Sequence, residues 1–305
     1  MKYYHGAAWR ETYFEGWYLK YKTKEGQALA LIPALHIDNR GQRRASLQVI
    51  TGRKTWWLEF PDTDFHASET QFQIRMGQTL FTEKGAWLNI DQNRLSLHGT
   101  LHNGTLTSLK SDIMGPFRFL PGMECSHGVI SMAHTLEGTV TLNGEVMDFS
   151  GGTGYIETDR GRSFPSTYLW TQCTWQAAQP TSLMLAIAAI PLPIGHFTGC
   201  ICAVVYDGKE YRLATYRGAQ IEDWSDSKAA IRQGKFRLEA NLLEGQGHPL
   251  RAPTNGNMDR TIHESLCATV RYRFWAGEKL LFEHTDHCAS FEYAENTDEK
   301  RKCRP

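Results

Sequence analysis

The sequence lacks an excess of either charge, a long apolar run and a recognisable leader. Lysine and arginine together number 33, as do aspartate and glutamate, so the net charge favours neither nucleic acid nor an anionic membrane as a partner. The longest apolar run, Leu183 to Ile190, is far too short to span a bilayer, and the N-terminus has no apolar signal segment. We therefore expect a cytoplasmic protein without a transmembrane segment and without a nucleic-acid partner.

Motifs for cofactor, metal and nucleophile chemistry are also missing. There is no phosphate-binding loop, and Gly151 to Gly154 lacks the downstream glycine and helix of a dinucleotide fingerprint. No Gly-x-Ser-x-Gly elbow occurs. His284, His287 and Cys288 match no strong zinc pattern, and surface histidines are the commoner alternative. The seven cysteines show no framework spacing, which favours reduced thiols. We expect no cofactor and no metal.

In many segments of the chain, apolar and polar residues alternate with a period of two. Trp17, Leu19 and Tyr21 alternate with polar neighbours, and Phe72 and Ile74 do the same further along. This pattern is typical of β-strands with one buried face. The sequence therefore predicts an all-β fold.

Turn sequences agree with this prediction. Asn103-Gly104, Asn143-Gly144 and Asp207-Gly208 supply the positive φ angles of a two-residue hairpin turn, and a fourth, weaker hairpin is expected at Ala276-Gly277. Only Asp226 to Gln233 has helical composition. Many strands with tight turns favour barrels, which can enclose a ligand in an apolar interior.

The segment from Gly128 to Asp159 is the most informative hairpin. A two-residue turn at Asn143-Gly144 pairs residues whose numbers sum to 287, and cross-strand partners point to the same face. We expect the following side chains on the inner face: Ile130, Met132, His134, Leu136, Val140, Leu142, Met147, Phe149, Tyr155 and Glu157.

Glu157 and His134 would then lie among apolar side chains. Burial raises the pKa of a carboxyl, which suits a general acid near neutral pH. A bulge at Gly151-Gly152 would turn Glu157 outward instead. A lone histidine on an apolar face is more often a hydrogen-bonded core residue.

Four stretches, in the expected order, resemble the tocopherol cyclase family. The first stretch is Phe14 to Tyr18, after His5-Gly6, and the second is Met123 to Met132, followed by His134. The third is Gly152 to Glu157, followed by Asp159, Gly161, Ser163 to Pro165, Tyr168, Trp170 and Gln172. The fourth is Leu250 to Thr254, followed by Gly256, Met258, Arg260, Ile262 and Glu264 to Leu266. Two departures are Arg160, where the family commonly has tryptophan, and Ala289 to Glu292, which matches the family's usual ending only loosely.

The resemblance implies a lipocalin-like (calycin) architecture of antiparallel β-barrels with very little helix. Two barrel-like halves would comprise residues 1–163 and 164–294, followed by a flexible tail at residues 295–305. The name-giving reaction is an isomerisation that closes a chroman ring on a prenylated quinol. An acid protonates an alkene and a phenol oxygen captures the cation, so neither a redox cofactor nor a metal is required. The implied partner is a hydrophobic small molecule, such as a prenyl-quinol, a terpenoid or a similar lipid.

The resemblance also directs attention to particular residues. The expected acid–base group is Glu157, Asp159, Glu124, His134 and His127, with Glu157 or Asp159 as proton donor and His134 as its orienting partner. The expected ligand-binding residues are Trp17, Tyr155, Trp170, Met132 and Phe149.

Other interpretations remain open at this point. Arg260 and Glu264 could tie the last strands to the barrel. The protein could be a non-enzymatic carrier of a hydrophobic ligand, or a structural module whose interior is filled by side chains, because a fold does not decide function.

Overall fold

The structure is a computed structural model that describes residues 2–120, 123–177, 179–191 and 196–295. Within these ranges the chain forms 22 β-strands and four short 3₁₀ helices, and no α-helix. The helices are η1 (Gly6–Ala8), η2 (Asp62–Asp64), η3 (Gly115–Phe119) and η4 (Thr215–Arg217). No helix in the described part of the chain has the length and apolarity needed to cross a membrane. The all-β prediction is confirmed, and most of the expected tail lies outside the described residues.

The first sheet contains the strands from the N-terminal part of the chain. They are β1 (Tyr13–Lys22), β2 (Ala28–Ile37), β3 (Arg43–Thr51), β4 (Thr55–Pro61), β5 (Phe65–Ala67), β6 (Gln73–Met76), β7 (Thr79–Thr82), β8 (Gly85–Gln92), β9 (Leu95–Asn103), β10 (Cys125–Leu142), β11 (Glu145–Asp148) and β12 (Thr153–Gly161). Their order is β4-β3-β2-β1-β12-β10-β9-β8-β7-β6-β5, with β11 paired to β10.

The second sheet contains the remaining strands. They are β13 (Tyr168–Gln176), β14 (Pro180–Pro191), β15 (His196–Tyr206), β16 (Lys209–Ala214), β17 (Gln220–Trp224), β18 (Lys228–Gln233), β19 (Phe236–Glu244), β20 (His248–Thr254), β21 (Asn257–Ala276) and β22 (Lys279–Ala294). Their order is β16-β15-β14-β13-β22-β21-β19-β18-β17, with β20 paired to β21. All pairings in both sheets are antiparallel.

Each sheet curves around its own apolar core. In the first half, Leu31 from β2 and Leu97 from β9 belong to one buried cluster, which we call the first core. In the second half, Leu185 from β14 and Leu238 from β19 belong to another, the second core. No strand pairing among the described residues joins β4 to β5 or β16 to β17, so backbone hydrogen bonds do not close either half. The fold is the lipocalin-like arrangement of two halves that the family resemblance implied.

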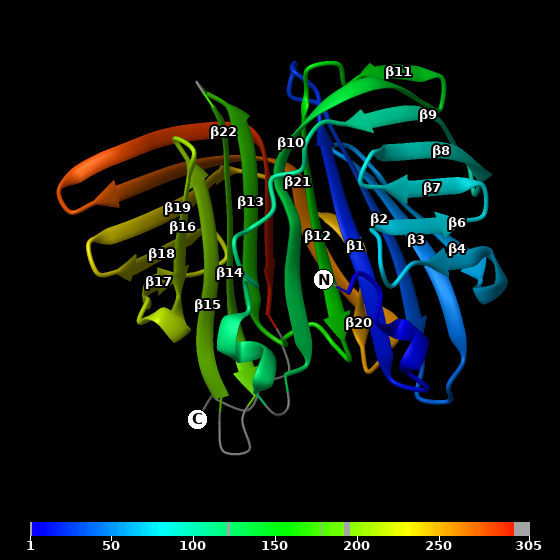
Figure 1. The fold of residues 1–305 in the computed structure, drawn as a ribbon, viewed down its shortest axis with the longest axis horizontal. Coiled ribbons are helices and arrows are strands. Elements are labelled where there is room, and N and C mark those ends of the chain that lie inside the picture. The colour runs from blue at the N-terminus through cyan, green and yellow to red at the C-terminus, as the bar shows by residue number, and fades with distance from the viewer. Residues whose placement is uncertain (1, 121–122, 178, 192–195, 296–305) are drawn as a thin grey trace.

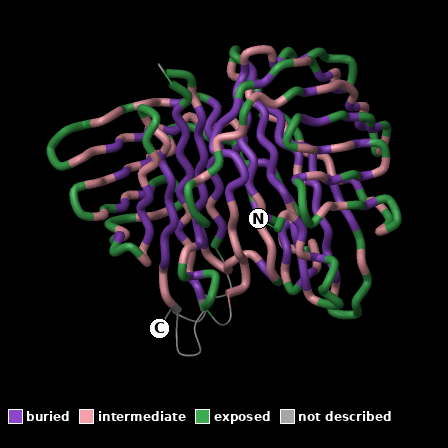
Figure 2. The backbone as a smooth tube through the Cα atoms, viewed as in Figure 1, coloured by how far each residue is buried: buried purple, intermediate pink, exposed green. Residues whose placement is uncertain are grey.

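The two halves lie side by side (Figure 1), and they share a third buried cluster. This central cluster includes Tyr18, Met132 and Tyr155 from the first half, and Trp170 and Leu266 from the second. Strand β10 contacts β14, and β2 contacts β21. Buried residues accordingly line the long strands in the middle of the molecule, while the hairpin ends are exposed (Figure 2).

The central hairpin keeps its predicted register near the turn and loses it further away. Val140 pairs with Met147, and Asn143 and Gly144 have φ values of 50° and 87°. Beyond the turn, two irregularities in β10 shift the pairing. Each bulge moves later side chains to the other face. The predicted inner face is therefore split, with Leu136 in the first core and Met132 in the central cluster.

Two local predictions are wrong. Asn103-Gly104 is not a hairpin turn, because Asn103 ends β9 and the chain reaches β10 only at Cys125. The segment with helical composition forms strand β18, in which Ala229 and Ile231 are buried at a spacing of two. Tertiary burial of an alternating face overrides weak helix propensity there. The turn at Asp207-Gly208 is confirmed, with φ values of 51° and 68°.

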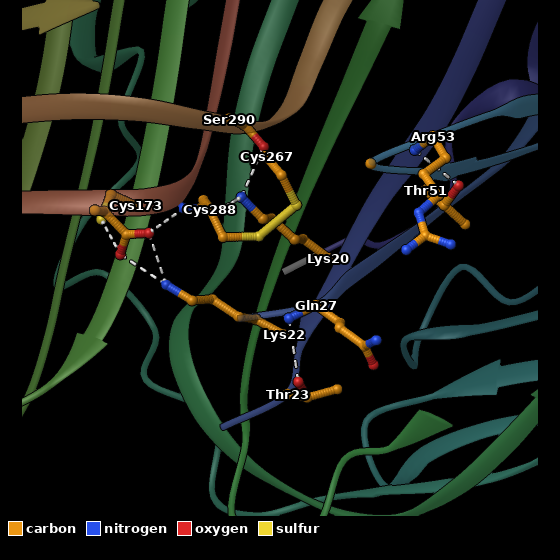
Figure 3. The surroundings of a disulfide bond; sticks show 12 residues. Lys20, Lys22, Thr23, Gln27, Thr51, Arg53, Cys173, Cys267, Cys288 and Ser290 are labelled. Carbon is orange, nitrogen blue, oxygen red and sulfur yellow. Dashed lines mark hydrogen bonds and ion pairs between the residues drawn. A yellow bond between two sulfur atoms is a disulfide. The ribbon is translucent and has the colours of Figure 1, made fainter. Parts of the chain in front are cut away.

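The expectation of reduced cysteines is wrong for one pair. Cys267 and Cys288 form a disulfide between β21 and β22, while Cys125, Cys173, Cys200 and Cys202 are free. Figure 3 shows the side chains of Lys20 and Lys22 directed from β1 toward this region. The ammonium group of Lys20 donates to the carbonyl of Cys288 at 2.9 Å.

His284 lies next to Asp286 and Cys173 in a group that resembles a set of metal ligands. The ammonium nitrogen of Lys22, however, is 2.7 Å from an Asp286 carboxylate oxygen. A resident cation already neutralises this carboxylate. We therefore interpret this group as a buried ion pair.

Candidate active site

A cavity of about 190 Å³ lies between the two halves. Its wall is mostly apolar: Phe14, Ile32, Ala34, Met114, Phe117, Phe164, Trp170, Ala186, Ile187, Ala188, Ile190, Ile201, Leu250 and Ile262 are among the lining residues. The interiors of the two halves are filled by the first and second cores. The expected ligand cavity inside a barrel is thus replaced by a cavity between the halves.

Polar side chains from both halves reach this apolar cavity. Those with an ionisable or phenolic group are Tyr18, Glu124, Cys125, His127, Glu157, Asp159, Tyr168, Arg251, Glu264 and Glu292. Ligand sites commonly combine an apolar wall with a few placed polar groups. Here half of those groups are carboxyls, which points to proton chemistry.

The first acidic group forms on β10 and β12. Tyr155, Glu157 and Asp159 are two residues apart on β12, so their side chains share a face. The Tyr155 hydroxyl donates to Glu157 Oε2 at 2.5 Å. The register pairs His127 with Asp159, and His127 Nδ1 lies 2.9 Å from Asp159 Oδ1, while its Nε2 lies 3.4 Å from Glu157 Oε2.

Burial and neighbouring charges set the protonation states of Glu157 and His127. Burial raises the pKa of Glu157 to about 8, and the charge of Asp159 adds to the rise while His127 opposes it. Burial lowers the pKa of His127, but the charges of Asp159 and Glu157 outweigh burial and raise it to about 9. Near neutral pH, Glu157 is therefore a protonated acid beside a positively charged imidazolium.

The second acidic group comes from β21 and β22. Glu264 and Glu292 are cross-strand partners, and both are buried. The Tyr18 hydroxyl, from the first half, donates to Glu264, and the Tyr168 hydroxyl donates to Glu292. Burial, together with the charges of neighbouring carboxylates, raises the pKa of Glu292 to about 8.

Sequence reasoning did not place these residues at a site. For Glu264 the sequence suggests, as one alternative, a tie between the last strands and the barrel, and Tyr18 belongs only to a motif of the family resemblance. One signal was available, because Ile262, Glu264 and Leu266 share a parity. A glutamate between two apolar residues on a buried face is a candidate functional group.

The predicted acid–base residues fall into two sets. Glu157, Asp159, His127 and Glu124 all line the cavity. Burial raises the pKa of Glu124, against the charges of Arg162 and Arg260. His134 lies apart from the cavity wall, and its Nδ1 is 3.0 Å from Ser131 Oγ. Its predicted place beside the acid is occupied by His127.

The predicted ligand-binding residues are also divided. Trp170 lines the cavity. Met132 and Tyr155 pack in the central cluster, and Tyr155 supports Glu157 through its hydroxyl. Trp17 and Phe149 lie in the first core, away from the cavity. At these two positions the side chains are on the face of the first sheet that is directed away from the cavity.

Arg260 has a structural role of the kind that the sequence suggested. Its guanidinium donates to the carbonyls of Pro165 and Ser166 at 2.6 and 2.8 Å. These residues lie in the link between the two halves, next to the cavity-lining Phe164. Arg260 therefore holds one wall of the cavity in place.

Comparison with known proteins gives a family and a fold. The sequence matches the tocopherol cyclase-like family over residues 103–294. No curated protein matches it. The crystal structure of CghA with Sch210972 is similar with a TM-score of 0.60 and 11% identity, covering 93% of this chain and 89% of that chain. Kievitone hydratase from Nectria haematococca has a TM-score of 0.51 and 10% identity, with coverages of 93% and 89%. At such identities the likeness concerns the fold alone.

Proposed function

We propose a function from one premise: this chain belongs to the tocopherol cyclase-like family. The protein catalyses a redox-neutral, acid-initiated cyclisation of a prenylated, apolar small molecule. The observation that carries this proposal is Glu157, a buried carboxyl whose pKa is raised to about 8, in the wall of an otherwise apolar cavity. A carboxyl that keeps its proton at neutral pH can act as a general acid.

The geometry suits protonation of an alkene. Glu157 transfers its proton to one alkene carbon, and the adjacent carbon becomes a tertiary cation. The carboxylate left on Glu157 is stabilised by the Tyr155 hydroxyl and by the positive charge of His127. The rings of Tyr18 and Trp170, which pack edge to face with centroids 5.2 Å apart, border the cavity and can stabilise a cation.

The apolar wall has a second role in this proposal. Water that reached the cation would add to it and end the reaction with the wrong product. Residues such as Ile32, Met114 and Ile262 restrict water at the cavity. The proposed step is of the same class as the one that the name of the kievitone hydratase describes, since a hydratase also adds an O–H bond across a double bond.

Replacement of Glu157 tests the proposal. A hydroquinone with a trisubstituted prenyl chain serves as the probe, and the reaction is followed in D₂O by mass spectrometry. Wild-type protein is expected to form the cyclic isomer with one deuterium on carbon. Glu157→Gln should lower this rate by roughly 10²- to 10⁴-fold, the usual contribution of a general acid, while the probe still binds.

The matched control is Glu137→Gln, an exposed glutamate on β10, which should react at the wild-type rate. If Glu157→Gln also kept the wild-type rate, Glu157 would not be the acid. If the wild-type protein bound the probe and never converted any such alkene, the protein would be a carrier.

A further inference from the structure

Glu264 is a buried carboxyl of the cavity that the protonation step does not use. It lies on β21 in the second half and is 1% exposed. Tyr18 joins it to the first acid group, because Tyr18 is the cross-strand partner of Glu157 and donates its hydroxyl hydrogen bond to Glu264. The cavity therefore presents one acid from each half, with Tyr18 between them.

The surroundings of Glu264 differ in kind from those of Glu157. Burial raises the pKa of Glu264, but the Tyr18 hydroxyl, the charge of Lys20 and the Ser290 hydroxyl all oppose this rise. These groups form one chain of contacts, because Ser290 Oγ is 2.9 Å from both the Tyr18 hydroxyl and Lys20 Nζ. Burial has the largest effect and keeps the pKa of Glu264 above its ordinary value, while Tyr18, Lys20 and Ser290 each stabilise its carboxylate form.

Lys20 can supply this positive charge near neutral pH. Burial lowers the pKa of Lys20 to about 8, so its ammonium form still dominates at pH 7. Its other hydrogen bond goes to the carbonyl of Cys288, in the disulfide between β21 and β22 (Figure 3). This second contact fixes the ammonium group beside Ser290.

Glu292 does not share these features. It is the cross-strand partner of Glu264, but Tyr168 is the group that stabilises its carboxylate, and the charges of Glu264, Asp159 and Glu157 all act against it. The surroundings of Glu292 therefore favour its carboxylate form less than those of Glu264 do.

We propose that Glu264 is the general base of the reaction, so that the first half of the molecule supplies the acid and the second half supplies the base. The inference rests on the proposed function. Glu157 gives its proton to the alkene carbon, whose π electrons form the new C–H bond. A lone pair of the substrate hydroxyl oxygen then forms the C–O bond at the cation, and the hydroxyl proton passes to the Glu264 carboxylate.

The charges balance over the cycle. After ring closure Glu157 is a carboxylate and Glu264 is a carboxylic acid. Solvent that enters once the product leaves returns a proton to Glu157 and removes one from Glu264. The reaction needs no oxidant, reductant or co-substrate, and the product is an isomer of the substrate.

Glu264→Gln should separate protonation from ring closure. In D₂O this variant keeps Glu157 and still protonates the prenylated hydroquinone. Without a base for the hydroxyl proton, the cation instead loses a proton from carbon to Glu157 and returns to a deuterium-labelled alkene. We expect the ratio of cyclic product to labelled alkene to fall roughly a hundredfold.

Tyr18→Phe provides a second variant if the glutamine protein fails to fold. It keeps the ring and removes the hydrogen bond to Glu264, so it should shift the same ratio in the same direction, by about tenfold. Glu283→Gln, at an exposed position on β22, is the matched control and should keep the wild-type ratio.

Failure of this inference can be distinguished from failure of the proposed function. If Glu157→Gln forms neither labelled alkene nor product while Glu264→Gln and Tyr18→Phe keep the wild-type ratio, Glu264 is not the base and Glu157 remains the acid. If Glu157→Gln forms both at wild-type rates, the proposed function fails first, and the inference fails with it.

Discussion

The buried carboxyl group of Glu292 makes the stability of the folded protein depend on pH. Glu292 is 7% exposed and contacts the Tyr168 hydroxyl. Burial, and then the charges of Glu264, Asp159 and Glu157, raise its pKa to about 8. In the unfolded chain the same group titrates near pH 4.5. Unfolding therefore releases a proton between these two values, and stability falls as the pH rises through this window.

Glu292→Gln should reduce this pH dependence. Glutamine accepts the Tyr168 hydrogen bond but carries no titrating proton. We expect the free energy of unfolding to fall less between pH 5 and pH 8 in the variant than in the wild type, by up to about 4 kcal/mol. Urea unfolding at the two pH values measures the difference. Parallel decreases in the two proteins would show that Glu292 titrates normally in the folded state.

At the scale of single elements, the irregular register of β10 decides which side chains meet. An uninterrupted hairpin with numbers summing to 287 would place Ile130 opposite Glu157. In the structure Val129 is opposite Glu157, and His127 is opposite Asp159. The net displacement of one residue thus brings His127, in place of Gly128, opposite Asp159 and within reach of Glu157. Gly151 and Gly152, the expected site of a bulge, lie in the break between β11 and β12. The pairing changes by one residue across them, from Thr139 opposite Asp148 to Thr135 opposite Thr153.

The pairing of β10 with β12 also contains a tight contact that can be tested. His134 is opposite Gly154, and a Cβ atom at Gly154 would lie 2.1 Å from His134 Nε2. The ring is buried and held by Ser131, so it cannot swing away. Gly154→Ala should destabilise the protein by about 3 kcal/mol in urea unfolding.

Two further variants check the cause of this loss. In a background carrying His134→Ala the same substitution should cost at least 1 kcal/mol less, as a double-mutant cycle would show. Gly52→Ala is the control, because a Cβ atom there meets only Cys267 at 3.5 Å, and it should stay within about 0.5 kcal/mol of the wild type. Additive effects at positions 134 and 154 would rule out the clash.

At the scale of the whole molecule, the cavity depends on the contact between the halves. The central cluster draws Tyr18 from β1 and Leu266 from β21, which is fully buried. The Thr174 hydroxyl, from the second half, also donates to the carbonyl of Met132. Separation of the halves would expose this cluster, so we expect them to unfold together.

Leucine-to-alanine substitutions in different cores test this cooperativity. Leu97→Ala lies in the first core and Leu266→Ala in the central cluster. Each should cost about 3 kcal/mol and lower the temperature of the same single calorimetric transition. Two resolved transitions, with Leu97→Ala lowering only one of them, would show that the halves fold independently.

The sequence by itself determined the strands and part of the site. The period-two pattern predicted β-strands, and Asn143-Gly144 and Asp207-Gly208 predicted two hairpins, because both signals are local. The spacing of Glu157 and Asp159 on one strand placed them together for the same reason. The motif that contains His127 supplied the third member of the group.

Only the tertiary structure decided where the cavity lies and which residues complete it. The shifts in β10 depend on packing on both faces of the strand, and an alternating pattern does not reveal them. Tyr18 and Glu264 are 246 residues apart, and their contact follows from the way one half packs against the other. The base therefore comes from a part of the chain that no local pattern connects to the acid.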